Sequence, residues 1–485
     1  MNDVKLTPKA VFEYFAQINK VPRPSKKEEK IIAFLQQFAK DNGLACKTDK
    51  TGNVLISKPA SEGMEDRETV VLQSHMDMVC EKTSDKKIDF AKDPIETYVD
   101  GEWLRAKGTT LGADDGIGVA IEMAVLADKN LKHGPIECLF TRDEETGLTG
   151  AMGLEKGFMT GKYLLNLDSE DEGEIFIGCA GGVNTEITFT YKPTATPRGT
   201  MTLKVSVDKL TGGHSGDDIN KNRANANKLL ARFLYQAMEQ FKIGLASFDG
   251  GNLHNAIPRN AEAVILVKET DKHKVRRAFN IFAAEAEEEY HVTEPNMVMK
   301  MQSVDKPESM MDKETAKNLV YALQAAHNGV LEWSQDIKGL VETSSNLASV
   351  KMKARNKVVI VTSQRSSILS QRNAMRDTII ATFTLAGAKC KAADGYPGWT
   401  PNTESTILKI AVEKYKQLFK KDPAVKAIHA GLECGLFSEK YPGMDMISFG
   451  PTLRGVHSPD ECLHIPTVQM VWDHIVEILK EIPVR

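Results

Sequence analysis

The order of apolar and polar residues in the first part of the chain predicts short buried strands that alternate with helices. Apolar positions repeat at helical spacing in "VFEYFAQI", in "KKEEKIIAFLQQFAKDNG" and over residues 116–128. Nearly continuous apolar runs stand between them, namely "TVVLQSH", "PIECLFT" and "KYLLNLD". Strands that are apolar on both faces and alternate with helices are typical of a mostly parallel sheet flanked by helices. The pattern therefore predicts an α/β domain, in which chemistry gathers where the strands end.

From about residue 187 the pattern changes to strands with one polar face. "GTMTLKVSVDKLTGG" and "AEAVILVKET" alternate apolar with polar residues, and the amphipathic helix "ANANKLLARFLYQAMEQF" lies between them. A second set contains "KVVIVTSQRSS" and "QRNAMRDTIIATFTLAG". The two sets are compatible with a distant duplication. We expect an α+β domain over residues 189–398, followed by Gly- and Pro-rich punctuation.

Two local features of the first part raise specific expectations. "SKKEEK" has the spacing of a capping box, from Ser25 to Glu28, at the start of a helix that closes on Gly43. "GADDGIG" places Asp114 and Asp115 together at the start of an apolar helix. Since an N-cap needs one acid, the second acid is either surface charge or has a role outside the helix.

Composition and charge narrow the classes of protein that fit. The chain has 485 residues, which favours two domains, and its 41% apolar and 26% charged residues are typical of a globular protein. The net charge is −4 and the cations are scattered, so a nucleic-acid partner is not supported. No apolar run approaches the roughly 20 residues of a membrane span, and the N-terminus has no signal-peptide core. The seven dispersed cysteines, without a CxxC pair, favour reduced thiols and a cytoplasmic protein.

Side chains that can bind metals follow three of the predicted strands. His75 and Asp77 end the first; the period of two in a strand puts them on one side, so Asp77 can hold one imidazole nitrogen while the other meets a metal. Asp143, Glu144 and Glu145 follow the second. Here one carboxylate can ligate a metal while the other reaches a bound water, although a solvated acidic turn is the simpler interpretation of these residues alone.

Asp168 follows the third strand, and Asp114 lies at a strand–helix junction where its two oxygens can bridge two ions, leaving Asp115 free to cap or support. So many acids at one sheet edge would repel one another without cations. Arg142 is the single cation that the sequence places near them. A divalent metal is the economical neutraliser, and the mixed imidazole and carboxylate ligands point to zinc, with manganese or cobalt possible.

A set of longer motifs resembles a known family along essentially the whole chain. They are "HMDMV", "GTTLGADDGIG", "DEETG", "NLDSEDEGEIFIGCAGG", "GGHSG", "NAIPR", "HAGLECG" and "GPTLRGVHSPDE". Together they are similar to the di-zinc metallopeptidase family that includes carnosinases, aminoacylases and peptidase T, and within it to the Xaa-His dipeptidases. Where that family is expected to have Asn after the bridging Asp, this chain has Asp115, and Arg142 with Asp143 precedes Glu144. These departures bear on fine specificity.

The resemblance implies a role for each residue of the centre. His75 and Asp168 are implied as ligands of one zinc, Glu145 and His457 as ligands of the other, and Asp114 as the bridge. Glu144 is implied as the general base and Asp77 as the residue that orients His75. The resemblance also implies a cis peptide bond between Asp114 and Asp115. Because His457 lies beyond the α+β domain, it further implies a discontinuous catalytic domain, residues 1–188 and 399–485, with an inserted lid, residues 189–398.

In the lid, the resemblance implies substrate-binding roles for three residues, each of which has a plainer structural interpretation on its own. His214 would steady the reacting carbonyl oxygen, Asn255 would bind substrate, and Arg365 would bind a free carboxylate. The implied protein is a cytoplasmic enzyme with two zinc ions per chain that hydrolyses dipeptides such as Xaa-His and carnosine-like substrates, as a homodimer formed through the lid. The alternatives are an N-acyl amino-acid deacylase or tripeptidase on the same scaffold and, from another class, a non-catalytic metal-bound binding module.

Overall fold

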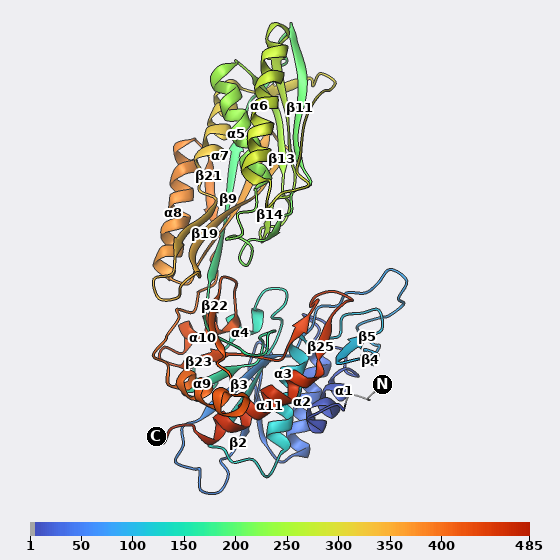
Figure 1. Cartoon of the computed structure of the whole chain (residues 1–485), viewed down its shortest axis with the longest axis vertical. Coiled ribbons are helices and arrows are strands. Elements are labelled where there is room, and N and C mark those ends of the chain that lie inside the picture. The colour runs from blue at the N-terminus through green and yellow to red at the C-terminus, as the bar shows by residue number, and fades with distance from the viewer. Residues whose placement is uncertain (1–4) are drawn as a thin grey trace. The chain divides into compact units, whose positions relative to one another are not determined.

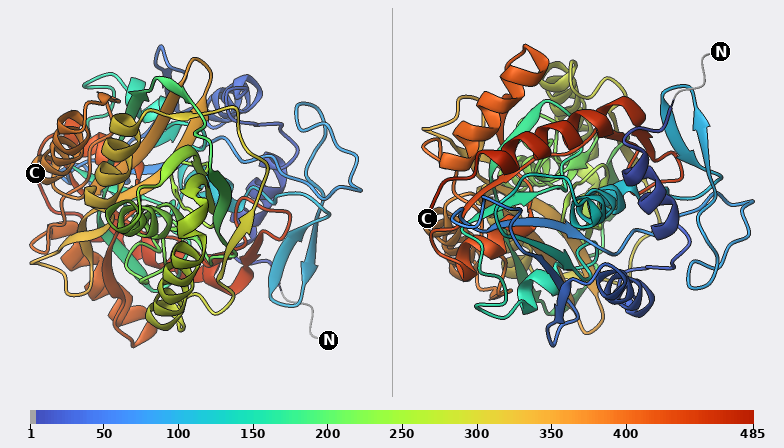
Figure 2. Two further views of the ribbon diagram at one scale, coloured as in Figure 1. Left: turned by 90° about the horizontal axis from the view of Figure 1, so that it is seen from above. Right: turned by 90° about the horizontal axis from the view of Figure 1, so that it is seen from below.

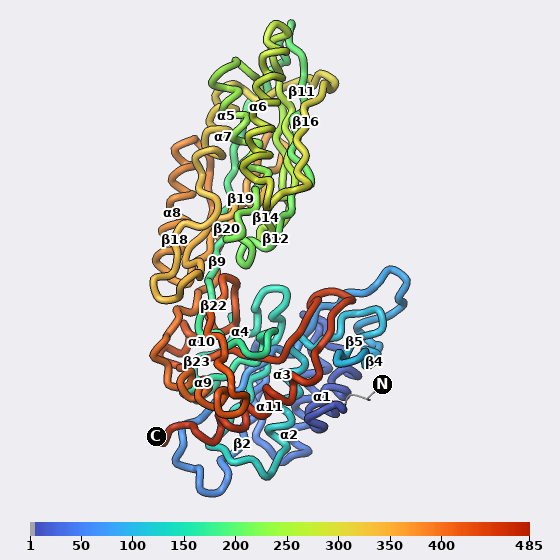
Figure 3. The backbone as a smooth tube through the Cα atoms, viewed as in Figure 1, coloured from blue at the N-terminus to red at the C-terminus, as the bar shows by residue number. Residues whose placement is uncertain are grey.

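The computed structural model describes residues 5–485, which form two compact units. The first unit contains the residues up to 178 together with 399–427 and 432–485, and the second contains 179–398 and 428–431. In Figures 1 and 2 the first unit accordingly combines the blue N-terminal and the red C-terminal elements. The chain trace runs through the second unit from green to orange (Figure 3). The boundary expected after residue 188 falls inside strand β9 (Gly181–Thr190), which lies wholly in the second unit.

An eight-stranded sheet forms the middle of the first unit. Its order is β1 (Ala45–Thr48), β2 (Val54–Lys58), β6 (Ile136–Thr141), β3 (Val70–His75), β7 (Tyr163–Asn166), β23 (Asp445–Ser448), β8 (Glu174–Cys179) and β22 (Ala424–Ile428). The central strands β6, β3, β7 and β23 pair in parallel, while the neighbouring pairs β2–β6 and β23–β8 are antiparallel. The α/β class expected from the apolar runs is confirmed, with the parallel part at the centre of the sheet.

Helices and a small second sheet complete this unit. The helices are α1 (Lys9–Ile18), α2 (Glu29–Asp41), α3 (Ala113–Ala127), α4 (Thr149–Gly153), α9 (Thr406–Phe419), α10 (Glu433–Lys440) and α11 (Ile465–Lys480). The small sheet has the order β24 (Leu453–Arg454), β25 (Cys462–His464), β5 (Trp103–Ala106) and β4 (Thr97–Asp100). Helix α3 packs between α1 and strand β3. Helix α1 buries the four residues that its helical spacing predicts, Val11, Phe12, Phe15 and Ile18.

The capping box expected at the start of α2 is wrong. Glu28 is itself the N-cap residue and no side chain caps this helix. The Ser25 hydroxyl instead donates to Asp77 Oδ2 at 2.7 Å, and Glu28 Oε1 accepts the Lys26 N–H at 2.6 Å. The local spacing is right for a cap, but Ser25 has a stronger acceptor, a buried carboxylate, elsewhere in the chain.

The second unit contains a nine-stranded sheet, and helices cover one face of it (Figure 1). The strand order is β16 (Val298–Ser303), β11 (Thr200–Asp208), β15 (Ala261–Lys268), β13 (Gly244–Gly250), β19 (Val341–Lys353), β20 (Lys357–Ser366), β9 and β21 (Lys389–Ala392), with β18 (Gly329–Trp333) beside β19. The helices are α5 (Ala226–Gln240), α6 (Lys272–Tyr290), α7 (Lys313–Ala325) and α8 (Leu369–Leu385). Two short ribbons, β10 (Pro193–Ala195) with β17 (Ser309–Met311) and β12 (Gly213–His214) with β14 (Ala256–Ile257), lie outside this sheet.

The large sheet of the second unit contains the same arrangement of strands and helices two times. The elements β11-α5-β13-β15-α6-β16 form one βαββαβ set, inserted after the first strand of a second set, β9-α7-β19-β20-α8-β21. In each set the first strand lies beside the third, the fourth strand is at the outer edge, and the second strand is at the centre. The two central strands, β13 and β19, meet in an antiparallel pair, Gly250 opposite Val350. This symmetry supports the interpretation of a distant duplication.

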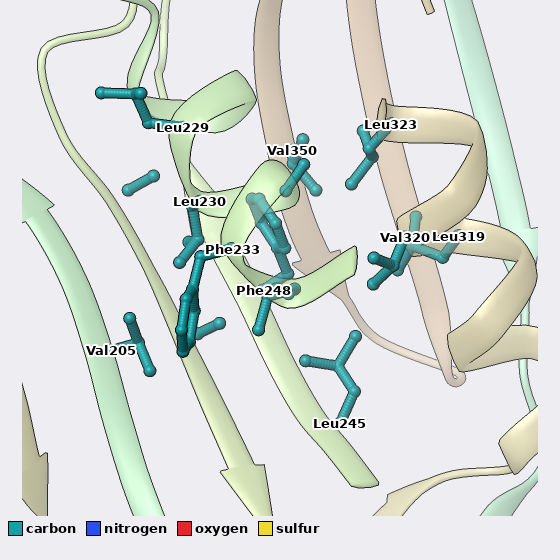
Figure 4. Packing of buried hydrophobic residues seen from close by; sticks show 14 of the residues in the cluster. Val205, Leu229, Leu230, Phe233, Leu245, Phe248, Leu319, Val320, Leu323 and Val350 are labelled. Carbon is teal, nitrogen blue, oxygen red and sulfur yellow. The ribbon is translucent and has the colours of Figure 1, made fainter. Parts of the chain in front are cut away.

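One continuous apolar core joins the two sets of the second unit. Phe233 of α5 packs among Val205 of β11 and Phe248 of β13, and Leu319 and Val320 of α7 belong to the same cluster (Figure 4). All are nearly or fully buried. Because the helices of both sets share this core, the unit is held by one hydrophobic interior rather than two.

Across residues 5–485, no helix is both long and apolar enough to cross a membrane. None of the seven cysteines, all of which lie in the described residues, forms a disulfide bond, as their dispersed spacing predicts.

Candidate metal centre

The carboxyl ends of three parallel strands bring the predicted ligands to one edge of the sheet. His75 of β3 lies opposite Thr141 of β6, and Gln73 lies opposite Asn166 of β7. The residues that follow these strands, Glu144 and Glu145 after β6 and Asp168 after β7, therefore leave the sheet beside His75. The strands are buried throughout, so the chain turns polar only where it reaches this edge.

Asp114 lies between two imidazole rings. Its Oδ1 atom is 3.1 Å from Nε2 of His75, and its Oδ2 atom is 3.0 Å from Nε2 of His457. The two oxygens of this carboxylate thus face different histidines, one on each side. This is the geometry that a carboxylate shared between two ions requires.

The remaining predicted ligands stand against the same two rings. His75 Nε2 is 3.5 Å from Asp168 Oδ1, and His457 Nε2 is 2.9 Å from Glu145 Oε2. Ligand atoms of His75, Asp114 and Glu145 all lie within 4.8 Å of one another. The structure therefore brings together all five side chains that were predicted to hold metal, in two pairs around Asp114.

The loop before α3 presents Asp114 in a conformation that a helix does not allow. Asp114 (ψ 109°) and Asp115 depart from helical backbone geometry, so regular helix begins after them. The Asp114–Asp115 peptide bond is cis, as the resemblance implied. Asp115 is buried and accepts the backbone N–H groups of His75 at 3.3 Å and Gly118 at 3.2 Å. The second acid therefore ties α3 to the end of β3, which answers the question its position raised.

Glu461 and Arg23 hold this loop from two sides. The Glu461 carboxylate accepts four consecutive backbone N–H groups, those of residues 111–114, at 2.8 to 3.3 Å. The buried Arg23 guanidinium donates to the carbonyl oxygens of Gly112 at 2.5 Å and Asp77 at 2.9 Å. A cation other than Arg142 thus lies at this edge, contrary to the sequence-based expectation. Since Arg23 binds backbone carbonyls, it positions the ligand loop without neutralising the ligands.

Asp77 lies against the ring of His75. Its Oδ1 atom is 3.3 Å from Nδ1 of His75, which leaves Nε2 for the centre. Asp77 also accepts the N–H groups of Glu144 at 3.1 Å and Glu145 at 3.3 Å, and the hydroxyl of Ser25. One buried carboxylate therefore positions a ligand, the candidate base and the second ligand at once, as supporting carboxylates do in metal sites.

The charges at this edge shift one another's proton affinity. Burial disfavours the charged form of His75, but Asp168, Asp114 and Asp77 outweigh burial and raise its pKa well above the ordinary value. Hydrogen bonds to Asp114 and Glu145 raise the pKa of His457 to about 11. Burial and the neighbouring acids raise the pKa of Asp168 to about 7, against the opposing effect of His75. In the absence of metal, these raised pKa values favour protonated imidazoles, whose charge partly balances the acids.

A divalent metal fits this set of side chains. Two imidazole nitrogens and three carboxylates converge, and Glu145 Oε1 is buried without a hydrogen-bond partner among the described residues. A buried carboxylate oxygen without a partner is expensive, and a cation would satisfy it. Imidazole with carboxylate is a ligand combination that zinc accepts.

Glu144 stands at the centre with an unusual proton affinity. Burial and the nearby acids Asp168, Glu145 and Glu433 raise its pKa well above the ordinary value, and only His75 acts against them. A carboxylate with a raised pKa is a better proton acceptor at neutral pH than an exposed one. Arg142 and Asp143, the departures before this residue, point elsewhere: Arg142 pairs with Glu28 at 2.7 Å and Asp143 accepts the Thr146 hydroxyl.

The three predicted substrate-binding residues lie in the second unit, within one polar region. His214 is in β12, with its Nδ1 atom 3.0 Å from Asp217 Oδ2. Asn255 accepts the Ser215 N–H with its backbone carbonyl at 2.8 Å. The buried Arg365 of β20 donates to the Tyr396 hydroxyl at 3.2 Å, and its Nε has no partner among the described residues.

Arg365 is surrounded by further polar residues that the sequence did not single out. The buried His429 binds Ser344 Oγ at 2.7 Å, and burial together with the charge of Arg365 lowers the pKa of His429 to about 3. Asp217 is also held ionised: against burial, His214 and Arg365 lower its pKa. A neutral imidazole and an arginine with a free donor suit the binding of an anionic group.

Sequence reasoning missed Arg23, Glu461, Glu433 and His429 as residues of these two regions. Three of them stand inside quoted motifs, His429 and Glu433 in "HAGLECG" and Glu461 in "GPTLRGVHSPDE". That shared placement was the available signal. Arg23 lies in "VPRPS", where nothing in the local pattern marks it.

Comparison with known proteins gives three similarities. The model of the family described as Peptidase family M20/M25/M40 matches residues 71–481. The cytosol non-specific dipeptidase of Escherichia coli (strain K12) is 43% identical over 481 residues, which cover 99% of each chain. The crystal structure of aminoacylhistidine dipeptidase from Vibrio alginolyticus superimposes with a TM-score of 0.93 at 43% identity, covering 99% of this chain and 98% of that one.

A more distant likeness concerns the fold alone. A tripeptidase from Staphylococcus aureus has a TM-score of 0.56 at 15% identity, with 98% of each chain covered. At that identity the shared architecture carries no information on substrate.

Proposed function

Because this chain belongs to peptidase family M20/M25/M40, we propose that it is a metal-dependent dipeptidase that cleaves Xaa-His dipeptides, carnosine-like substrates among them. The observation that supports this most directly is Asp114, whose two oxygens lie against His75 and His457. The names of the relatives that match the full chain, a non-specific dipeptidase and an aminoacylhistidine dipeptidase, agree with a dipeptide as substrate. They differ on how narrow the choice of dipeptide is.

In this proposal His75 and Asp168 would hold one zinc ion, Glu145 and His457 would hold a second, and Asp114 would be shared between them. Manganese or cobalt would suit the same ligands. When bound, two such ions would polarise the carbonyl group of the substrate and lower the pKa of a water molecule towards neutrality. Asp77 keeps His75 in the orientation that binding needs.

Glu144 is the proposed general base. It accepts the proton of the attacking water and then delivers it to the amine that leaves as the peptide bond breaks. Its buried position and raised pKa match this double role, since the carboxyl group must be able to hold the proton between the two steps. The hydrogen bond that the Glu144 backbone N–H donates to Asp77 Oδ1 holds the base in place.

The residues of the second unit are proposed to bind the rest of the substrate. The positive charge of Arg365 would pair with a free C-terminal carboxylate, and its Nε, which has no partner among the described residues, is available as a hydrogen-bond donor. His214 would donate to the reacting carbonyl oxygen, and Asn255 would bind the peptide backbone. In this role the second unit is the lid of the enzyme.

The experiment that tests the function is hydrolysis of a substrate panel by the purified protein loaded with zinc, manganese or cobalt. The panel contains Xaa-His dipeptides, carnosine, other dipeptides, tripeptides and N-acyl amino acids. Preferential cleavage of dipeptides supports the proposal, whereas preference for tripeptides or acyl amino acids favours a tripeptidase or a deacylase. Absence of hydrolysis with all three metals would favour a non-catalytic metal-bound binding module.

We propose two further properties on the basis of the same family relationship. A homodimer formed through the second unit is consistent with exposed apolar side chains there, such as Ile281, Val292 and Leu385. Light scattering at several protein concentrations measures this, and a monomer at all of them contradicts it. The relative from Escherichia coli is named as a cytosol enzyme, and we expect the same compartment here.

A further inference from the structure

A row of buried polar side chains lies just below the metal centre, in the first unit. Asn166 of β7 donates to Gln73 of β3 at 2.7 Å, and Gln73 donates to Glu433 Oε2 at 2.6 Å. The hydroxyl of Thr141, at the end of β6, donates to the same Oε2 atom at 2.6 Å. Glu433, the first residue of α10, therefore connects β3 and β6, two of the three strands that lead into the predicted ligands.

Glu433 lies on the face of the sheet that carries the centre. Gln73 and His75 are two positions apart on β3, so their side chains point to the same side. Thr141 pairs with His75 in the parallel register, which puts its side chain on that side as well. A carboxylate that binds both Gln73 and Thr141 must lie on this face, and it is close enough to contribute to the raised pKa of Glu144.

One oxygen of Glu433 is left over. The residue is fully buried, both donors bind Oε2, and Oε1 has no partner within the described part of the chain. Burial raises the pKa of Glu433 to about 7. Leaving such an oxygen unpaired destabilises the protein unless a cation or a donor meets it in the working enzyme.

Apart from the predicted ligand Glu145, the other buried acids near the centre do not offer a free oxygen on this face. Asp77 and Glu461 are saturated by the N–H and O–H groups described above. Glu122 has two unpartnered oxygens, but it lies by Ser74, whose side chain points to the opposite face of β3 from His75. The charges of Asp114 and His457 affect the pKa of Glu170. Glu170 is exposed to solvent, however, so water can solvate its carboxylate.

A dipeptidase has a specific need for such an acid. The amino group of its substrate is free and cationic, and in an α-dipeptide such as alanyl-histidine one carbon separates it from the carbonyl group that is attacked. Acids that bind metal cannot also neutralise it. An enzyme that recognises this group therefore needs a separate carboxylate beside the ligands.

We infer that Glu433 binds the free α-ammonium group of the dipeptide through Oε1, while Oε2 stays fixed by Gln73 and Thr141. The inference rests on the proposed dipeptidase function and names the group by which the enzyme distinguishes a free N-terminus from a blocked one. It also gives the "HAGLECG" segment a chemical role.

The test compares alanyl-histidine with N-acetyl-alanyl-histidine on the wild type and on Glu433→Gln, both loaded with zinc. Glutamine keeps an oxygen for Gln73 and Thr141 but replaces the free oxygen with an amide that repels an ammonium group. We expect kcat/KM for alanyl-histidine to fall about 10- to 100-fold, the loss of one charge-assisted contact, while the value for the acetylated peptide stays the same. Equal effects on both peptides, or loss of zinc in elemental analysis, would mean a structural role and overturn the inference.

The matched control is Glu170→Gln, which should keep the wild-type preference for the free amine. If it abolishes that preference and Glu433→Gln does not, the ammonium site is at Glu170 and the inference is wrong. Calorimetric binding of both peptides to zinc-loaded Glu144→Gln, with and without Glu433→Gln, applies the same comparison without turnover. Failure of the wild type to cleave dipeptides would refute the proposed function, whereas unchanged binding of alanyl-histidine after Glu433→Gln would refute the ammonium site alone.

Discussion

Glu145 and His457 are 457 − 145 = 312 positions apart in the sequence, yet Glu145 Oε2 lies 2.9 Å from His457 Nε2. Glu145 follows a strand of the N-terminal part, and His457 lies in the segment after the second unit. The candidate centre therefore exists only when both parts of the first unit are folded together. Substitutions of single residues on either side of the second unit can therefore test the proposed centre.

Replacing the proposed base should separate catalysis from metal binding. We expect Glu144→Gln to keep both metals and to lose about 10²- to 10⁴-fold in kcat, since the side chain moves protons and does not ligate. Elemental analysis and steady-state kinetics on a cleaved dipeptide measure the two properties. The exposed Glu62→Gln is the control and should behave as wild type. Full activity of Glu144→Gln would show that another group is the base.

Removing His457 should leave one metal ion per chain. His75 and Asp168 lie on the other side of Asp114, so His457→Ala disturbs only one of the two pairs. Elemental analysis after dialysis measures the ratio, and the exposed His273→Ala provides the control for loss of an imidazole. Two metals per chain in His457→Ala would remove this residue from the set of ligands.

Metal binding should weaken as the pH falls. Without metal, the pKa of His457 is about 11, so at neutral pH its ring carries a proton that a metal must displace. Binding then releases that proton, and the apparent affinity rises about tenfold per pH unit as the pH increases towards 11, for this residue alone. Titration of zinc in buffers of different ionisation enthalpy measures the released protons. An affinity that does not change between pH 7 and 9 would contradict a protonated His457.

Glu461 should support metal affinity without touching the metal. Its carboxylate accepts the four N–H groups of residues 111–114, so Glu461→Ala frees the loop that presents Asp114. We expect a 10- to 100-fold loss of zinc affinity, the usual effect of removing a supporting group, together with a lower Tm. Glu461→Gln, which keeps acceptor oxygen but loses charge, should lose less. Equal and unaltered affinity in both variants would show that the loop holds its shape alone.

Arg365→Ala should affect substrates according to their C-terminus. We expect a raised KM for dipeptides with a free carboxylate and little change for the same peptides with a C-terminal amide, because only the former present a negative charge. Steady-state kinetics on matched pairs of peptides measures this. A KM that rises equally for both kinds would mean that Arg365 supports the second unit rather than binding the carboxylate.

The strand ends were the part of the centre that the sequence could predict. The buried runs before His75, Glu144 and Asp168 are local features, and a parallel sheet places their ends together. The position of Asp114 also follows from a local pattern, two acids where a helix cap needs one. His457 came only from the resemblance, since no periodicity links it to residues on the far side of the insertion.

The supporting residues could not be predicted from the sequence, because their partners are distant along the chain and many of the partner atoms belong to the backbone. Arg23 binds carbonyl groups of Asp77 and Gly112, which every residue type would offer. Ser25 has the spacing of a cap and donates to Asp77 instead. The local sequence pattern predicts which groups need a hydrogen-bond partner. Which partner each group has depends on the three-dimensional path of the chain.

Strand β23, residues Asp445–Ser448, lies between β7 and β8 in the middle of the first sheet. A ribosome thus has to make more than nine-tenths of this chain before that gap can be filled, and His457 emerges later still. The second unit is formed by an almost continuous stretch of sequence, so its folding does not depend on the C-terminal segment in this way. We therefore expect the nascent chain to remain unable to retain its full complement of metal until its C-terminal segment has been synthesised, which makes complete cofactor loading a post-translational event.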